Sequence, residues 1–309
     1  MSCRENLRLN PKQFGQVKFH CWLGIAHHFL GDQAAAQLHC ERSMALVVEL
    51  GTFNVNFFGF DQRIRALVFL ARSLWLRGFS DQALRIMQRT IGEATSRDHP
   101  VPICVSLVYA SMLLLWTGDL QGASDRIEQL IVHAGRYSLA PYRALGIALK
   151  GELAVACDEA EAGLDLLQGA LETLRAQQYN LLITRIIGAS ADGLRKTGQF
   201  EEALFTINGA IARATNSGVE LDLSELLSIK SQVLAARHDR ESAMHCLTEA
   251  LTVARAKSAL AWELRSTMVL ARLLSEGGQR DQARHALALV YDRFTEGFET
   301  CVYRKPHPS

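Results

Sequence analysis

The sequence predicts an all-α fold, a right-handed α-solenoid of about seven helical hairpins. Three observations predict it: a turn residue that recurs about every 40 residues, small residues at fixed distances on both sides of it, and apolar residues at helical spacing after it. Repeats of about 20–50 residues are typical of stacked supersecondary units. At 309 residues the chain is also longer than one compact core usually allows, so an elongated array fits its length.

The predicted turn position is a glycine in five of seven hairpins, and alanine stands five residues after it in all seven. A small residue stands seven positions before it in six cases, the exception being Lys150, which has Gly151 beside it. Glycine tolerates the positive φ of such a turn, and small residues allow two helices to cross closely. The predicted turns are Gly31, Gly78, Gly118, Cys157, Gly198, His238 and Gly278.

The second helix of each hairpin carries an apolar stripe, as in Leu204, Ile207 and Ile211. One hairpin cannot bury such a stripe alone, so the units are expected to stack. We predict an N-terminal extension over residues 1–13, the solenoid over 14–300 and a disordered tail over 301–309.

Two segments depart from the regular pattern. The first interval, 47 residues, contains the insertion GTFNVNFFGFDQ (51–62), which is predicted to be a loop whose phenylalanines plug a groove. Residues 100–118 carry no charge over a length close to a membrane span. Its two initial prolines and its Ser and Thr residues favour a buried helix instead.

Composition and motifs argue against several functions. The formal net charge of +1 gives no general attraction for nucleic acid or acidic membranes. The seven cysteines are scattered without a C-x-x-C pair, and the N-terminus lacks an apolar signal region, so we expect reduced thiols in a cytoplasmic protein. No G-x-x-x-x-G-K-[ST] loop is present, and GASADG (188–193) lacks the spacing of a nucleophile elbow.

Histidine precedes cysteine three times, at His20, His39 and His245. Neighbours on a helix point about 100° apart, which favours core cysteines beside water-facing histidines over a zinc site. We therefore expect no enzymatic activity, no cofactor and no metal; an enzyme would need chemistry that none of these motifs indicates.

The order of small residue, glycine turn and alanine resembles the tetratricopeptide repeat, most clearly in CWLGIAHHFLGDQAAAQ (21–37). The period of about 40 residues exceeds the usual length of about 34, which implies longer helices or loops. HEAT repeats share the longer period, but the Gly-x-x-x-x-Ala turn favours the tetratricopeptide type.

Residues 63–85 and 261–300 are similar to the C-terminal helical-repeat region of large bacterial signalling ATPases, and the resemblance covers essentially the whole chain. It is strongest in the last repeat, which contains WELR, LARL and FTEGF. In that family a winged-helix or nucleotide-cyclase head is joined to an ATPase module and then to such repeats. After FTEGFET the family continues into a short amphipathic helix, whereas this chain ends in CVYRKPHPS.

The resemblance implies a non-catalytic protein-interaction and signal-sensing module that would bias an ATPase and its head. The family's head and ATPase match no residue of this chain. The alternative is a stand-alone adaptor, or a truncated fragment of such a regulator.

Basic residues gather at positions predicted to line the concave face, which the first helix of each unit forms in tetratricopeptide arrays. Against them stand Asp192 and Glu225. The excess predicts a protein or peptide partner with an acidic segment, or an anionic ligand, and no nucleic acid or membrane. The alternative is a solvated face with intrahelical pairs such as Asp192 with Arg195. The basic positions are Lys18, Arg65, Arg72, Arg185, Arg195, Arg265 and Arg272.

Overall fold

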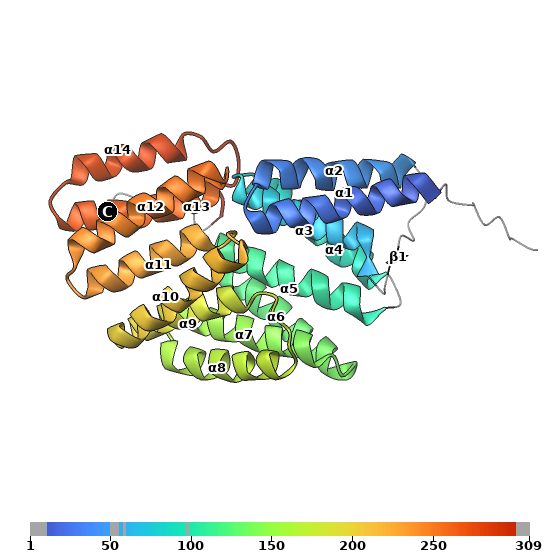
Figure 1. Cartoon of the computed structure of the whole chain (residues 1–309), viewed down its shortest axis with the longest axis horizontal. Helices are drawn as coiled ribbons and strands as arrows, with labels where there is room; N and C mark the ends of the chain where they lie inside the picture. The colour runs from blue at the N-terminus through green and yellow to red at the C-terminus, as the bar shows by residue number, and fades with distance from the viewer. Residues whose placement is uncertain (1–10, 50–55, 58–59, 97–98, 301–309) are drawn as a thin grey trace, which may run out of the picture.

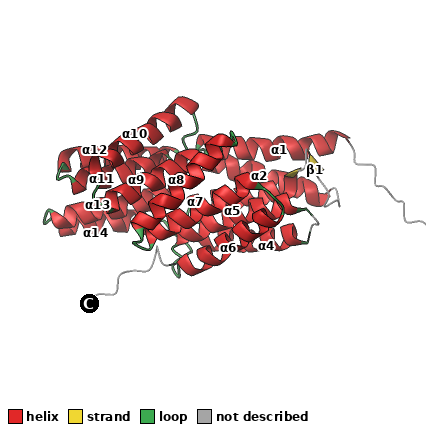
Figure 2. Cartoon of the chain, turned by 90° about the horizontal axis from the view of Figure 1, so that it is seen from below, coloured by secondary structure: helices red, strands yellow, loops and turns green. Residues whose placement is uncertain are grey.

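The computed structural model describes residues 11–49, 56–57, 60–96 and 99–300, and this part of the chain is almost entirely helical (Figure 2). It contains fourteen α-helices in seven antiparallel pairs (Figure 1). The predicted all-α solenoid of seven hairpins is therefore confirmed. The pairs are α1 (Pro11–Leu30) and α2 (Gln33–Glu49), α3 (Gln62–Leu76) and α4 (Ser80–Thr95), α5 (Pro100–Thr117) and α6 (Leu120–Arg136), α7 (Ala140–Ala156) and α8 (Ala160–Ala176), α9 (Ile183–Lys196) and α10 (Phe200–Ser217), α11 (Leu223–Ala236) and α12 (Arg240–Ala256), and α13 (Leu260–Glu276) and α14 (Arg280–Tyr291).

The insertion before α3 contains a short antiparallel hairpin of β1 (Asn56–Phe57) and β2 (Phe60–Asp61). The segment does not continue a helix over these residues, as predicted, but the four residues pair as short strands and are not plain loop. Asp61 then caps α3, because its Oδ1 accepts hydrogen bonds from the backbone N–H groups of Arg63, at 2.9 Å, and Ile64, at 3.1 Å. The predicted groove-plugging role depends on the side chains of the phenylalanines in this insertion. The structure describes at most the backbone of these residues, so the prediction lies outside the described part of the chain.

One of the seven predicted turns is wrong by a residue. Cys157 has φ −85°, and the left-handed residue is Asp158, with φ 64°. Aspartate tolerates this conformation better than most side chains because it is short and polar. With Asp158 as the turn, the small residues before and after it are Gly151 and Gly163, so the exception at Lys150 disappears.

These small residues lie where the two helices of a hairpin cross. A Cβ atom added to Gly163 would lie 2.8 Å from the carbonyl oxygen of Gly151 and 2.7 Å from Cγ2 of Val155. In the first hairpin, a Cβ atom on Gly24 would lie 2.5 Å from Sγ of Cys40. The helix backbones are thus close enough to exclude any larger side chain, which explains the small-residue pattern.

The fourth hairpin offers a test with a matched control on one helix. Gly163→Ala should destabilise the protein by about 1–3 kcal/mol, because the new methyl group meets a backbone oxygen that cannot move away. Gly169→Ala, also on α8 but with no atom within 4 Å of the added Cβ, should stabilise it by about 0.5–1 kcal/mol through helix propensity. Urea unfolding midpoints measure both; shifts of the same sign would contradict the crossing geometry.

The superhelix turns far enough for its last hairpin, α13–α14, to meet its second, α3–α4. The inner helices α3, α5, α7, α9, α11 and α13 contact one another in order, and α13 also contacts α3. Figure 1 shows the orange and red C-terminal hairpins beside the blue N-terminal ones. Trp262 of α13 packs against Trp75 of α3 and Trp116 of α5, with both ring-centroid distances 5.2 Å. The first helices of the second to seventh hairpins therefore form a closed ring.

Residues 292–298, which follow α14, add a second contact across the closure. The Phe294 ring lies against the turn at Gly78, and the Glu296 carboxylate accepts hydrogen bonds from the backbone N and Nε2 of Gln82, at 2.9 and 3.2 Å. The Gly297 N–H donates to Asp81 at 3.2 Å. The FTEGF motif thus joins the end of the solenoid to the start of α4.

The uncharged segment forms α5, as predicted, and lies within the ring between α3 and α7. It is long and apolar enough to span a membrane, and 67% of it is buried inside the protein. A core helix of a soluble protein has these same properties, and the neighbouring helices here account for its apolar surface.

Ring closure can be tested at the tryptophans. Trp262→Ala should cost about 3–5 kcal/mol, because it removes a large side chain that is 1% exposed and leaves a cavity between α3, α5 and α13. Small-angle scattering should also show a larger radius of gyration. Trp22→Ala is the control, since Trp22 is 47% exposed, and it should cost less than about 1 kcal/mol. An unchanged radius together with equal losses would contradict closure through Trp262.

Candidate functional site

A pocket of about 150 Å³ opens on the inner face of the ring. Five successive inner helices, α5, α7, α9, α11 and α13, contribute to its walls. Apolar side chains such as Ile229 form part of its wall, and six charged side chains make the rest of the wall strongly polar. The aromatic and charged residues of this inner-face pocket are Trp116, Glu152, Arg185, Asp192, Asp222, Glu225 and Arg265.

Ion pairs between neighbouring repeats organise the inner-face pocket. Arg185 on α9 pairs with Glu152 on α7, and Nη2 of Arg265 on α13 lies 2.7 Å from Oε1 of Glu225 on α11. Each pair links two adjacent inner helices. Arg265 and Glu225 occupy the same position in successive repeats, 40 residues apart, whereas Arg185 and Glu152 are 33 residues apart. Because both members of each pair are at least partly buried, these contacts are screened less than surface pairs.

Arg72 lies behind this pocket and is fully buried on α3. Its guanidinium carbon is 4.6 Å from the ring centroid of Tyr109 and 5.4 Å from that of Trp116. The guanidinium of Arg185 lies 5.0 Å from the same Trp116 ring. Burial lowers the pKa of Arg72 to about 10, while the nearby Tyr109 and Asp222 oppose that shift. The charge is thus held mainly by aromatic faces.

The carboxyl groups of Asp222 and Glu225 are held in a desolvated setting. Burial raises the pKa of both groups above its usual value, although Arg185 and Arg72 act in the other direction on Asp222, and Arg265 and Arg185 do so on Glu225. Desolvation disfavours the ionised form of a carboxyl group. Both carboxyl groups therefore take up a proton at a higher pH than exposed carboxyl groups do.

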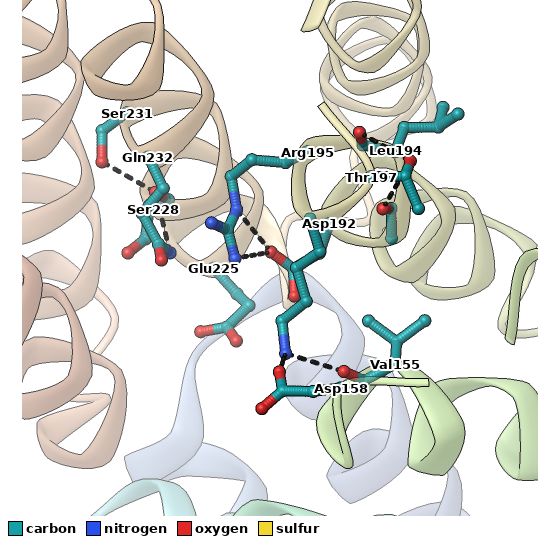
Figure 3. Close-up of polar contacts among 12 residues, drawn as sticks. Val155, Asp158, Asp192, Leu194, Arg195, Thr197, Glu225, Ser228, Ser231 and Gln232 are labelled. Atoms are coloured by element: carbon teal, nitrogen blue, oxygen red, sulfur yellow. Dashed lines mark hydrogen bonds and ion pairs between the residues drawn. The ribbon is translucent and has the colours of Figure 1, made fainter. Parts of the chain in front are cut away.

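Three of the predicted basic residues come together around this pocket: Arg72, Arg185 and Arg265. Arg195 lies at its rim and forms an intrahelical ion pair with Asp192, with Nη2 2.8 Å from Oδ1, as the alternative interpretation expected. Figure 3 shows this pair on α9, with the side chain of Glu225, on the neighbouring α11, below it.

The other three basic residues lie elsewhere. Arg65 is on α3, with its guanidinium 4.2 Å from the ring centroid of Trp22. Lys18 is half-buried on α1, and Arg272 is exposed near the end of α13. The described residues therefore show one cluster of three arginines, and not a continuous row of seven basic side chains.

Sequence reasoning missed Glu152 and Asp222. Glu152 occupies the same repeat position as Asp192 and Arg72, six residues before the turn, but only when the turn is placed at Asp158. The one-residue error at Cys157 put Gly151 there instead and hid the carboxylate. Asp222 precedes α11 as its N-cap residue, outside the helical positions from which inner-facing residues were selected.

The histidine–cysteine neighbours form no metal site in the part of the chain that the structure describes, where no group of three or more His, Cys, Asp or Glu residues is arranged to hold an ion. Nδ1 of His20 lies 2.9 Å from Nδ1 of His39. The adjacent Cys21 and Cys40 are buried, and burial raises the pKa of the Cys21 thiol to about 12. These cysteines therefore behave as core residues.

Several solved structures resemble this fold. A Rap protein complexed with competence and sporulation factor gives a TM-score of 0.61 at 12% identity, over 92% of this chain and 77% of that chain. The apo form of RapI gives 0.59 at 11% identity, over 89% and 96%. NprR in complex with its cognate peptide NprX gives 0.55 at 15% identity, over 91% and 80%. No family model and no curated protein matches the sequence.

At these identities the likeness concerns the fold, which is a tetratricopeptide-like α-solenoid, as the repeat pattern predicted. The similar structures also support the interpretation of this chain as a tetratricopeptide-like repeat region. The finer resemblance to the repeats of signalling ATPases remains a prediction.

Proposed function

We propose that the protein is a non-catalytic interaction module that binds a protein or peptide segment at the inner-face pocket. The observation that carries this proposal is that five successive inner helices supply the walls of one pocket. A segment seated there contacts several repeats at once and gains affinity from many modest contacts. Two of the similar structures are complexes, one with competence and sporulation factor and one with the peptide NprX, which supports a peptide as the partner.

The finer proposal is a sensing role, as in the repeats that end large bacterial signalling ATPases. A ligand that contacts both α9 and α13 favours whichever arrangement of the inner helices fits it best, and so shifts the population of ring conformations. The similarity of residues 63–85 and 261–300 to that family supports this role. A stand-alone adaptor is the alternative, in which the ring holds its partner without passing on a signal.

We further propose that the bound segment presents an acidic group. Arg185 and Arg265 face the pocket, but each already has a carboxylate partner. An incoming carboxylate competes with these partners, and proton uptake by Glu225 and Asp222 makes that competition easier because burial has raised their pKa values. Arginine–carboxylate pairs that form in a partly desolvated pocket are the strong, charge-assisted kind.

A labelled eight-residue peptide of alternating glutamate and leucine tests this proposal. It should bind more tightly than the same peptide with lysine in place of glutamate, and its affinity should fall between low and physiological salt as charges become screened over about 8–10 Å. The double variant Arg185→Gln, Arg265→Gln should weaken binding by about tenfold or more.

The matched control is the double variant Arg237→Gln, Arg240→Gln. Arg237 has a carboxylate partner of its own, Glu201, at 2.7 Å, but it lies at a turn away from the inner-face pocket. Fluorescence anisotropy measures all four affinities. Equal losses of affinity in the two double variants would contradict the acidic-partner proposal. An affinity that does not change with salt concentration would contradict it too.

Binding should also depend on pH. Because burial raises the pKa values of Asp222 and Glu225, both carboxyl groups gain protons at a higher pH than peptide glutamates, whose pKa is near 4.3. As the pH falls toward that value, the pocket carboxyl groups take up protons while the peptide glutamates stay ionised. The affinity for the glutamate peptide should therefore rise over this range. The variant Asp222→Asn, Glu225→Gln should bind it with an affinity that no longer changes with pH; a wild-type profile that is flat, or that falls, would contradict the role of these groups.

A further inference from the structure

We propose that the inner-face pocket, at the part of its wall formed by Trp116 and Arg185 with the buried Arg72 beside them, binds the carboxylate group of a small ligand, and that Asp222 accepts a hydrogen bond from the same ligand. This inference goes beyond the peptide-binding proposal, and its first test does not depend on it. The ligand class is a carboxylate that bears a nearby donor, as in an amino acid or the end of a peptide chain.

The proposal rests on buried side-chain nitrogen atoms that have no hydrogen-bond acceptor in the described part of the chain. Nε, Nη1 and Nη2 of Arg72 are all buried and find no hydrogen-bond acceptor among the described residues. Nε of Arg185 and the indole Nε1 of Trp116 share this property within the same part of the chain. A buried donor without a partner costs free energy, and for a charged group the cost is larger. Five such nitrogen atoms lie at or near the ring of Trp116. An anion with several acceptor oxygens, such as a carboxylate, would satisfy more than one of them.

The two guanidinium groups contact a common surface. Both lie within 5.4 Å of the Trp116 ring centroid, and Trp116 and Arg185 line the inner-face pocket. Carboxylates pair with guanidinium groups in a planar, bidentate manner. The pocket of about 150 Å³, which Arg72 adjoins without lining it, is of the size that holds a benzene-like molecule. It therefore admits a small organic acid, or one terminal residue of a longer peptide whose other residues lie outside it.

Asp222 would bind a second group of the ligand, an ammonium or N–H donor. Its Oδ1 is buried and has no donor within the described residues, and it also lines the inner-face pocket. Arg72 and Arg185 both act electrostatically on its carboxyl group. An ammonium or N–H group of the ligand that faces Asp222 while its carboxylate faces the arginines would satisfy both sets of atoms.

The proposed site also spans the ring. Arg72 belongs to α3 and Trp116 to α5, whereas Arg185 belongs to α9 and Asp222 directly precedes α11. A ligand that contacts these four residues links elements from both sides of the Trp75–Trp116–Trp262 cluster. Occupancy should therefore stabilise the closed ring and change the fluorescence of its tryptophans.

Sodium acetate and glycine serve as probes with the full chain, each compared with sodium chloride at equal ionic strength. Acetate should raise the thermal unfolding midpoint in a saturable manner and change tryptophan fluorescence, since a ligand that binds only the folded state stabilises it. Glycine should have the lower apparent Kd, because its ammonium group can reach Asp222. No shift beyond the chloride control with either probe would overturn the proposal.

Arg72→Met is the decisive variant. It should leave the midpoint without ligand unchanged or higher, because it removes a buried charge that lacks hydrogen-bond partners, and it should weaken acetate by about tenfold or more. The control is Arg195→Met, which removes an arginine that has its own partner, Asp192, and should keep the acetate response. A full acetate response in Arg72→Met, whatever its midpoint, would overturn the assignment.

Asp222→Asn supplies a second, shape-conserving variant. It should keep the acetate response and remove the preference for glycine. A preference for glycine that survives Asp222→Asn would overturn the role of Asp222.

Trialanine with a free or an amidated C-terminus tests whether the ligand's carboxylate belongs to a peptide end or to a free small acid. Binding of the free form alone, lost in Arg72→Met, would identify a peptide end as the ligand. Binding of glycine without either peptide would identify a free small acid. If neither the peptides nor glycine binds, the proposed ligand class is wrong.

Discussion

Closure of the superhelix through Trp262 is the interaction on which the rest of this structure depends. A solenoid of hairpins normally has two ends, and each end leaves an apolar face that needs a cap. Here the indole of Trp262 meets those of Trp75 and Trp116, at 5.2 Å from each, and Phe294 covers the turn at Gly78. The last hairpin thus serves as the cap of the early ones. The FTEGF segment, which the sequence marks only as a motif, holds this contact in place.

Closure changes the chemistry of the inner face. On an open concave surface, arginines such as Arg72 and Arg185 would be solvated and their charges screened. Inside the ring, Arg72 is fully buried and burial lowers its pKa to about 10, while burial raises the pKa of Asp222. Both shifts reflect the cost of holding charge away from water. Around Trp116 the structure holds several such groups together, and a cluster of perturbed pKa values in a pocket is a mark of binding sites.

Much of the fold could be predicted from sequence because the repeat is local: one turn residue, two small residues and an apolar stripe define each hairpin. The same locality explains the error at Cys157, where Ala162 imitated the expected alanine while the true turn used Asp158 and Gly163. The site was only half predictable. The arginines stood at regular repeat positions, but Glu152 was hidden by that register error. Ring closure joins Trp75 to Trp262 across most of the chain, through the summed curvature of six repeats, and no local pattern encodes that sum.

The two proposed binding events are linked by the geometry of the ring. A segment in the inner-face pocket contacts Arg185 and Arg265, whereas a carboxylate deeper inside contacts Arg185 and Arg72, so Arg185 belongs to both. In either binding event, a ligand that binds Arg185 competes with its partner Glu152. Any protein segment bound at the pocket then meets a different charge pattern on α7 and α9. Coupling between two ligands requires only such a shared element with two arrangements, and because Arg72 stands beside the tryptophan cluster, the same rearrangement reaches the contact that keeps the ring closed.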